Sequence, residues 1–270
     1  MTGVNISGKF IRIDSLPNGV KKIIFNRPEV RNAFHGEMMD EISGALTKLA
    51  SLKEIEMRLL ILEGEGKFYS AGADLKYMKE QSTKSEAENL NDARHLGRMF
   101  FKLASFPTPV ISAVRGAAIG GALGLTVCSD YVLCDENAIF LTSEVLLGIV
   151  PGVISPYIIR KLGVANSSAF MLSGKKLNAQ QAEKIGLVNK VVLEADLSQE
   201  LDKVVKEFLM AGPNAARKTK ELIHHCSPLP SQELFEFCAE QIAQARATQE
   251  AQEGLTAFFD KHTPSWCRDL

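Results

Sequence analysis

Short apolar runs alternate with longer helical patterns through the first two thirds of this 270-residue chain. We expect strands at Lys21–Phe25, Met57–Gly64, Val110–Val114 and Asp130–Cys134, and helices at Glu37–Leu52 and Ser85–Ala104. The run at Met57–Gly64 is continuously apolar, which is typical of a strand buried on both faces. Strands that alternate with helices predict an α/β fold with a mainly parallel, helix-covered sheet.

The pattern changes after Ser155, because the rest of the chain is almost entirely helical. Only Gly186–Val192 returns to a strand pattern. Further helices are predicted at Ala179–Lys184, Asp196–Met210 and Asn214–Cys226. A later stripe of Leu234, Cys238, Ile242 and Ala245 keeps helical spacing and must cover an apolar surface, either in its own domain or on another subunit.

Composition limits the classes of partner. The formal net charge is −1, so no bulk attraction to nucleic acid or to an anionic membrane is expected. The five cysteines are odd in number and contain no CxxC pair, which favours neither a zinc site nor a disulfide framework. The N-terminus lacks a signal-peptide layout, and no apolar run reaches the ~20 residues of a membrane span, so a cytoplasmic protein is expected.

The segment FYSAGADL (Phe68–Leu75) follows a predicted buried strand and leads into a helix at Asp74. Its small residues let a ligand approach the backbone, and unpaired N–H groups at such a turn suit an oxygen that gains negative charge. Taken alone, the segment is explained more simply by a plain strand-to-helix turn with Asp74 as a helix cap.

The segment Gly116–Gly124 has the same character. Its glycines match neither nucleotide-phosphate fingerprint, and there is no G-x-S-x-G nucleophile motif in the chain. Gly120 and Gly124 are also explained by close helix packing. Two turns of this kind could direct two N–H groups at one oxygen.

Glu144 lies in the mostly apolar segment FLTSEVLLGIVPG. A carboxylate in apolar surroundings has a raised pKa, which is the property that a proton shuttle needs. The alternative is a solvated or ion-paired glutamate at a helix start. Asp130 and Asp135 are expected to be surface charges that flank a strand. The five histidines have no metal-site spacing, so no metal site is predicted.

Taken together, ordered motifs from about Phe10 to Trp266 resemble the enoyl-CoA hydratase/isomerase (crotonase) superfamily. These motifs are NRPEVRNAF (Asn26–Phe34), FYSAGADL, PTPVISAV leading into RGAAIGGALGL, SEVLLGIVPG, LSGKKLNAQQAEKIGLVNKVV and FFDKHTPSW.

The resemblance implies repeated ββα units, with twisted sheets covered by helices. It implies a core domain at 1–195 and a C-terminal helical region at 196–270 that forms trimers, often paired into hexamers. The implied substrate is an acyl-CoA thioester, with coenzyme A as part of the substrate and no separate cofactor.

The resemblance also assigns site residues. The oxyanion-hole N–H donors are Ala73 and Gly121, and the general acid/base is Glu144. Residues implied to line the CoA path or to contact its phosphates are Arg31, Ala33, Ala71, Asp74, Leu75, Gly120 and Lys261, the last from a neighbouring subunit if the chain is a trimer.

One position departs from the family pattern. Two-glutamate hydratases carry a carboxylate three residues after the oxyanion glycine, where this chain has Gly124. Three functions stay open. The first is a hydratase that works with Glu144 alone, similar in GGALGL and SEV…ISPY to hydratases of the methylglutaconyl-CoA type. The second is a Δ3,Δ2-enoyl-CoA isomerase, which needs one base. The third is an acyl-CoA-binding or assembly protein with little turnover.

Overall fold

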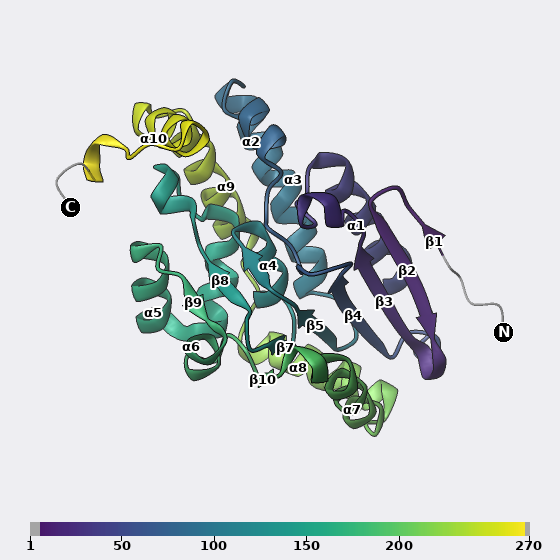
Figure 1. Cartoon of the computed structure of the whole chain (residues 1–270). Coiled ribbons are helices and arrows are strands. Elements are labelled where there is room, and N and C mark those ends of the chain that lie inside the picture. Colours follow the sequence, from purple (N-terminus) through teal and green to yellow (C-terminus); the bar gives the residue numbers. More distant parts are fainter. Residues whose placement is uncertain (1–5, 268–270) are drawn as a thin grey trace.

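The computed structural model describes residues 6–267 (Figure 1). Its main sheet has the spatial order β1-β2-β3-β4-β5-β7-β10 within this range. The strands are β1 (Ile6–Ser7), β2 (Ile11–Leu16), β3 (Val20–Phe25), β4 (Leu59–Gly64), β5 (Val110–Val114), β7 (Tyr131–Asp135) and β10 (Lys190–Val192). The pairs β1–β2 and β2–β3 are antiparallel, and every pair from β3 to β10 is parallel. The predicted α/β fold with a mainly parallel sheet is therefore confirmed.

Side-chain alternation along β4 explains its continuous apolar run. Leu60 and Leu62 point into the larger core, under α1 (Gly36–Ala50) and α3 (Glu86–Ala104). Leu59 and Ile61 point to the opposite face, into a second core that is closed by α7 (Leu197–Leu209). Because both faces are covered by helices, β4 has no polar side, as the sequence predicts.

A second, smaller sheet contains β6 (Ala117–Ile119), β8 (Ile139–Leu141) and β9 (Leu177–Asn178). None of these strands is predicted individually, because two or three residues are too few to show a period-2 pattern. Asp135 precedes β8 and corrects one expectation. It is buried rather than a surface charge, and its carboxylate accepts hydrogen bonds from the N–H groups of Gly116 and Asn137, both at 2.8 Å. It therefore fixes the turn that leads into β6.

The remaining helices surround the two sheets (Figure 1). The α-helices are α2 (Leu75–Gln81), α4 (Gly121–Val127), α5 (Ser155–Ser173), α6 (Ala179–Lys184), α8 (Pro213–Cys226), α9 (Gln232–Arg246) and α10 (Gln249–Asp260). The 3-10 helices are η1 (Pro17–Gly19), η2 (Pro28–Val30), η3 (Glu144–Leu147), η4 (Gly152–Ile154), η5 (Glu194–Asp196) and η6 (Ser265–Cys267). Within residues 6–267, no helix combines the length and apolarity needed to cross a bilayer.

The apolar stripe on α9 packs within its own chain. α9 lies along α3 and η4, and Cys238 and Ile242 are buried there. The Phe235 ring fits against Gly97 of α3, where an added Cβ would lie 2.4 Å from the ring. Leu234 is the exception to the predicted stripe, since it stays 42% exposed. α10 continues this packing by contacting η3.

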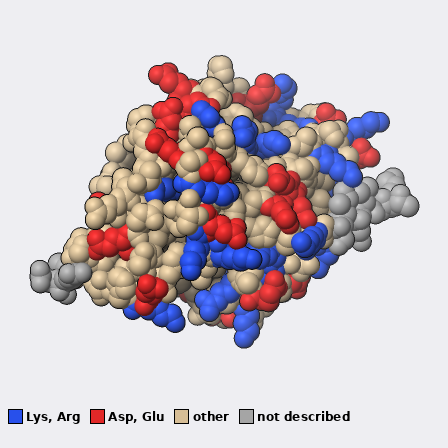
Figure 2. Space-filling view, turned by 90° about the horizontal axis from the view of Figure 1, so that it is seen from above, with Lys and Arg blue, Asp and Glu red and all other residues tan. Residues whose placement is uncertain are grey.

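Charged side chains of both signs are mixed over the face shown in Figure 2. Opposite charges also pair directly within the chain, as in the contacts Lys22–Glu63 and Arg94–Glu236. This face therefore carries no extended field of one sign.

Candidate active site

The two glycine-rich segments of the sequence meet through backbone pairing. Isolated parallel bridges join Ser70 to Ala118 and Phe34 to Ala73. Gly72 has a φ of +87°, and a Cβ there would lie 2.4 Å from the Ile119 carbonyl oxygen and 3.8 Å from the Gly121 nitrogen. Only glycine allows this approach, which brings residues 72–73 beside Gly121.

Two backbone N–H groups are free at this junction. The Phe34 N–H donates to the Gly72 carbonyl at 2.8 Å, and the Asp74 N–H donates to the Phe34 carbonyl at 3.0 Å. This parallel pairing uses the peptides on either side of Ala73, so the Ala73 N–H faces away from Phe34. Gly121 is the first residue of α4, where an N–H has no intrahelical acceptor. Neither N–H has an acceptor among residues 6–267, so both are available to a ligand oxygen.

Glu144 places its carboxylate beside these donors. It is the first residue of η3, and its Oε1 lies 3.3 Å from the position that a Cβ on Gly120 would occupy. The Ser143 Oγ is 3.9 Å from the same position. The Glu144 Oε2 is enclosed and has no hydrogen-bond partner among the described residues. An enclosed, unpartnered carboxylate oxygen next to free N–H donors is suited to exchange a proton with a bound ligand.

Burial controls the ionisation of Glu144. It raises the pKa of this carboxyl to about 7, against smaller opposing effects of its own backbone N–H and of the Arg246 guanidinium. Arg246 ends α9 and donates to Asp92 at 2.8 Å and to Asn89 at 3.3 Å, while Asp92 also accepts from the Tyr77 hydroxyl. Sequence reasoning did not identify Arg246, because its partners Asn89 and Asp92 on α3 lie more than 150 residues earlier in the chain.

The position of the missing second carboxylate is filled by apolar side chains. A Cβ on Gly124 would lie 2.6 Å from the Phe100 ring and 2.7 Å from the Ile154 Cγ2. The sequence leaves this position as a vacancy, but α3 and η4 close it. No carboxylate could enter here without displacing Phe100 and Ile154.

We therefore expect the substitution Gly124→Ala to destabilise the fold. Overpacking of a closed core costs about 1–3 kcal/mol, and urea unfolding measures the loss. Gly44→Ala in α1 is the matched control, because its Cβ would meet nothing within 4 Å and alanine favours the helix. A Gly124→Ala protein as stable as Gly44→Ala would contradict this packing.

The residues predicted along the CoA path fall into two groups. Arg31 is exposed and lies over the Phe68 ring, and its carbonyl accepts from the Ala71 N–H at 2.9 Å. Leu75 is 55% exposed at the start of α2. Ala33 is buried. The structure thus brings Arg31 and Ala71 together, and Arg31 and Leu75 are accessible to a ligand.

Asp74, Gly120 and Lys261 have structural roles in this single chain. The Asp74 carboxylate caps α2 through the N–H groups of Lys76 and Tyr77. The Gly120 N–H donates to the Leu141 carbonyl at 2.8 Å, which ties the second segment to β8. Lys261 is exposed at the left-handed C-cap of α10, and within residues 6–267 no contact joins it to the other predicted site residues.

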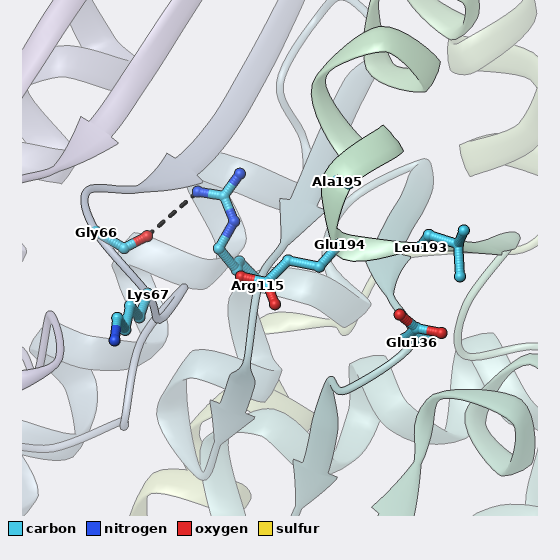
Figure 3. Close-up of a pocket in the computed structure, with 7 residues that line it drawn as sticks. All are labelled: Gly66, Lys67, Arg115, Glu136, Leu193, Glu194 and Ala195. Carbon is cyan, nitrogen blue, oxygen red and sulfur yellow. Dashed lines mark hydrogen bonds between the residues drawn. The ribbon is translucent and has the colours of Figure 1, made fainter.

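A separate hollow of about 630 Å³ lies at the carboxyl end of the main sheet (Figure 3). Figure 3 shows Arg115 directed at Gly66, whose carbonyl accepts its hydrogen bond at 3.2 Å, with Glu136 and Leu193 on the other side. The hollow is open, has charges of both signs and contains none of the predicted site residues. The hollow therefore does not support the candidate site at Glu144, which is identified from the backbone geometry around Ala73 and Gly121. Among residues 6–267, no cluster of three or more His, Cys, Asp or Glu side chains could hold a metal ion.

Comparisons with known proteins cover nearly the whole chain. The family model described as enoyl-CoA hydratase/isomerase matches residues 15–269. A 2,3-dehydroadipyl-CoA hydratase of Escherichia coli is 32% identical over 90% of this chain and 93% of its own length. A trans-2-decenoyl-[acyl-carrier-protein] isomerase of Streptococcus mutans is 26% identical over 93% of this chain and 96% of its own.

Solved structures agree with this match. The crystal structure of an enoyl-CoA hydratase from Shewanella pealeana is 34% identical, covers 95% of this chain and 96% of its own, and superposes with a TM-score of 0.77. With the family model spanning both glycine-rich segments and Glu144, the chain belongs to the enoyl-CoA hydratase/isomerase family.

Proposed function

We propose that this protein is an enoyl-CoA hydratase that adds water across the α,β double bond of an acyl-CoA thioester. The observation that carries the proposal is the unpartnered Glu144 Oε2 beside the free N–H groups of Ala73 and Gly121. Several family relatives are named as enoyl-CoA hydratases, which supports the same reaction.

The geometry suggests how one glutamate performs the reaction. The N–H groups of Ala73 and Gly121 donate to the thioester oxygen. Ionised Glu144 takes one proton from water while the water oxygen bonds to the β carbon and the double-bond electrons move to the thioester oxygen. The enolate then takes that proton from Glu144 at the α carbon, so the carboxylate is restored. No cofactor is needed beyond the coenzyme A of the substrate.

Each hydrogen-bond donor stabilises the negative charge on the enolate oxygen. Loss of one such donor typically costs about 2.7–4 kcal/mol of barrier. A single donor therefore contributes on the same scale as a general acid/base, whose usual contribution is about 10²–10⁴-fold.

A Δ3,Δ2-enoyl-CoA isomerase is the second candidate. It needs a single base that moves a proton between the α and γ carbons, and Phe100 and Ile154 close the position of a second carboxylate. One relative is named as an isomerase. An acyl-CoA-binding or assembly protein with little turnover is the third.

The test supplies a 2-enoyl-CoA and a 3-enoyl-CoA separately. Loss of the conjugated thioester absorbance with formation of hydroxyacyl-CoA supports the hydratase. Appearance of that absorbance from the 3-enoyl-CoA supports the isomerase. Binding of both thioesters without reaction would overturn both enzymatic proposals in favour of the third.

The pH dependence follows from the burial of Glu144. Both enzymatic mechanisms start from the ionised carboxylate, so kcat/KM rises with pH through an apparent pKa of about 7. The rate falls on the acid side, because below this pH the Glu144 carboxylate is protonated and can no longer act as a base. Initial rates measured in well-buffered solutions between pH 5 and 9 give the dependence of kcat/KM on pH. A profile that is flat from pH 5.5 to 8 would contradict the role of Glu144.

The methylglutaconyl-CoA type of substrate is our proposal for the acyl group. It rests on the resemblance of GGALGL and SEV…ISPY to that type of hydratase. Turnover of straight, branched and carboxylated enoyl-CoA thioesters, compared at equal concentration, tests it.

We further propose a homotrimer, alone or paired into a hexamer. Large apolar side chains are exposed on the C-terminal helices, among them Leu222, Ile223, Phe237 and Phe258. Exposed apolar side chains that join into a contiguous patch mark protein–protein interfaces, whereas singly scattered ones do not. Light scattering gives the mass in solution.

A further inference from the structure

The direction of the Ala73 N–H depends on a short backbone pairing. Phe34 and Ala73 form an isolated bridge with only two hydrogen bonds, outside both sheets. On the N-terminal side, the same two segments are also joined by the Ala71 N–H, which donates to the Arg31 carbonyl at 2.9 Å, and by the Ser70 hydroxyl, which donates to the Asn32 carbonyl at 2.7 Å. Within the bridge itself the pairing is short, so a side-chain contact across its flanking residues adds to its rigidity.

The Arg27 guanidinium makes that contact from both sides of the bridge. Its Nη1 donates to the Ala33 carbonyl, directly before Phe34. Its Nη2 donates to the Asp74 Oδ2 at 2.9 Å, directly after Ala73. One rigid planar group therefore joins the residues that flank the paired positions.

The surroundings of Arg27 fix its orientation. The side chains of Arg27 and Asp74 are each 14% exposed, so water screens their attraction little. The guanidinium carbon lies 5.5 Å from the centre of the Phe10 ring, which supports it from one face. The other Asp74 oxygen accepts from Lys76 N–H at 2.9 Å, so the carboxylate is held at both ends.

The ionisation of Asp74 agrees with this contact. Burial by itself raises the pKa of Asp74, but hydrogen bonds from Arg27, Tyr77 and Lys76 outweigh it and hold the pKa below its usual value. Asp74 is thus an anion around neutral pH, and the pairing with Arg27 is a charged one.

We propose that Arg27 is a positioning residue of the oxyanion hole, which holds the Ala73 N–H toward the thioester oxygen by joining Ala33 to Asp74. The inference rests on the proposed function, because it concerns the same two donors. Lysine could not replace it fully, since an ammonium offers a point charge rather than two parallel donors in a fixed fork.

The test compares Arg27→Met, Arg27→Lys and Asp74→Asn with the wild-type protein. Asparagine still caps a helix, so Asp74→Asn removes the charge and keeps the start of α2. Arg12→Lys is the matched control, because Arg12 also joins two carboxylates, Asp14 and Glu65, but is 42% exposed.

Two readouts separate positioning from general damage. The first is kcat and KM for whichever enoyl-CoA the wild type converts. The second is the absorption of a bound donor-substituted cinnamoyl-CoA thioester, whose band moves to the red when its carbonyl oxygen accepts hydrogen bonds. A purely structural residue would change thermal stability without changing the red shift of the folded, ligand-bound protein.

We expect Arg27→Met to lower kcat roughly tenfold to 10²-fold with little change in KM, and to reduce the red shift. Asp74→Asn should show the same pattern, and Arg27→Lys should recover part of both. Unchanged kcat and red shift in Arg27→Lys and Asp74→Asn would overturn the inference, even where Arg27→Met does not fold. If the wild type converts no enoyl-CoA, the proposed function fails, and the red shift alone still decides the role of Arg27.

Discussion

The substitution Glu144→Gln is expected to lower kcat by roughly 10²–10⁴-fold, the usual contribution of a general acid/base. Glutamine has nearly the same shape, but it can neither take a proton from water nor deliver one to the α carbon. The thioester would still meet the N–H groups of Ala73 and Gly121, so the affinity for acyl-CoA should change little. Steady-state kinetics and calorimetric titration with a saturated acyl-CoA measure the two quantities.

The thermal stability of Glu144→Gln provides a check on the ionisation of Glu144 that is independent of activity. Because the pKa of folded Glu144 is raised to about 7, its native state holds a proton that the unfolded state has lost above pH 4.5. The free energy of unfolding therefore falls as pH rises from about 4.5 to 7. Neutral glutamine removes this loss, so Glu144→Gln should melt at a higher temperature than the wild type at pH 8.

A matched control is Glu56→Gln, since Glu56 is exposed between α1 and β4. It should leave kcat and the melting temperature unchanged. If Glu144→Gln turned over substrate as fast as the wild type, the proposed mechanism would be wrong, whatever its melting temperature.

The second large effect is expected from Gly72→Ala. The new Cβ would lie 2.4 Å from the Ile119 carbonyl oxygen, a backbone atom that cannot rotate away. The two segments must separate, which moves the Ala73 and Gly121 N–H groups apart. Because a misplaced oxyanion donor costs about 10²–10³ in kcat, a loss in that range is expected in steady-state assays.

Gly186→Ala separates this effect from simple backbone strain. Gly186 also has a positive φ, +81°, but a Cβ there would meet nothing within 4 Å. Both variants should lose about 1 kcal/mol or more of stability from the left-handed conformation. Only Gly72→Ala should lose kcat, and equal activities in the two folded variants would contradict the proposed junction.

Much of the fold could be predicted from the sequence because its long elements carry clear periodicity. The strand predicted at Val110–Val114 is observed with the same bounds as β5, and the helix predicted at Glu37–Leu52 is observed as α1. The strands β6 and β8 escaped prediction, since three residues show no period. Yet these two short strands position Gly120 and Gly121.

The candidate site was predicted only through the resemblance of ordered motifs. Each turn by itself fitted an ordinary helix cap, and Glu144 fitted a solvated surface residue. The structure brings Ala73, Gly121 and Glu144 together, while their catalytic roles stay predictions. Arg27 was missed, because its contacts with Ala33 and Asp74 become visible only when the loop after β4 folds back over η2.

The sequence by itself determined the alternation of strands and helices and the presence of two segments rich in small residues. Residue type and spacing decide these local properties. Only the tertiary structure decided the ionisation of Glu144 and the closure at Gly124 by Phe100 and Ile154. Burial and close approach depend on which distant segments pack together, and no single segment encodes them.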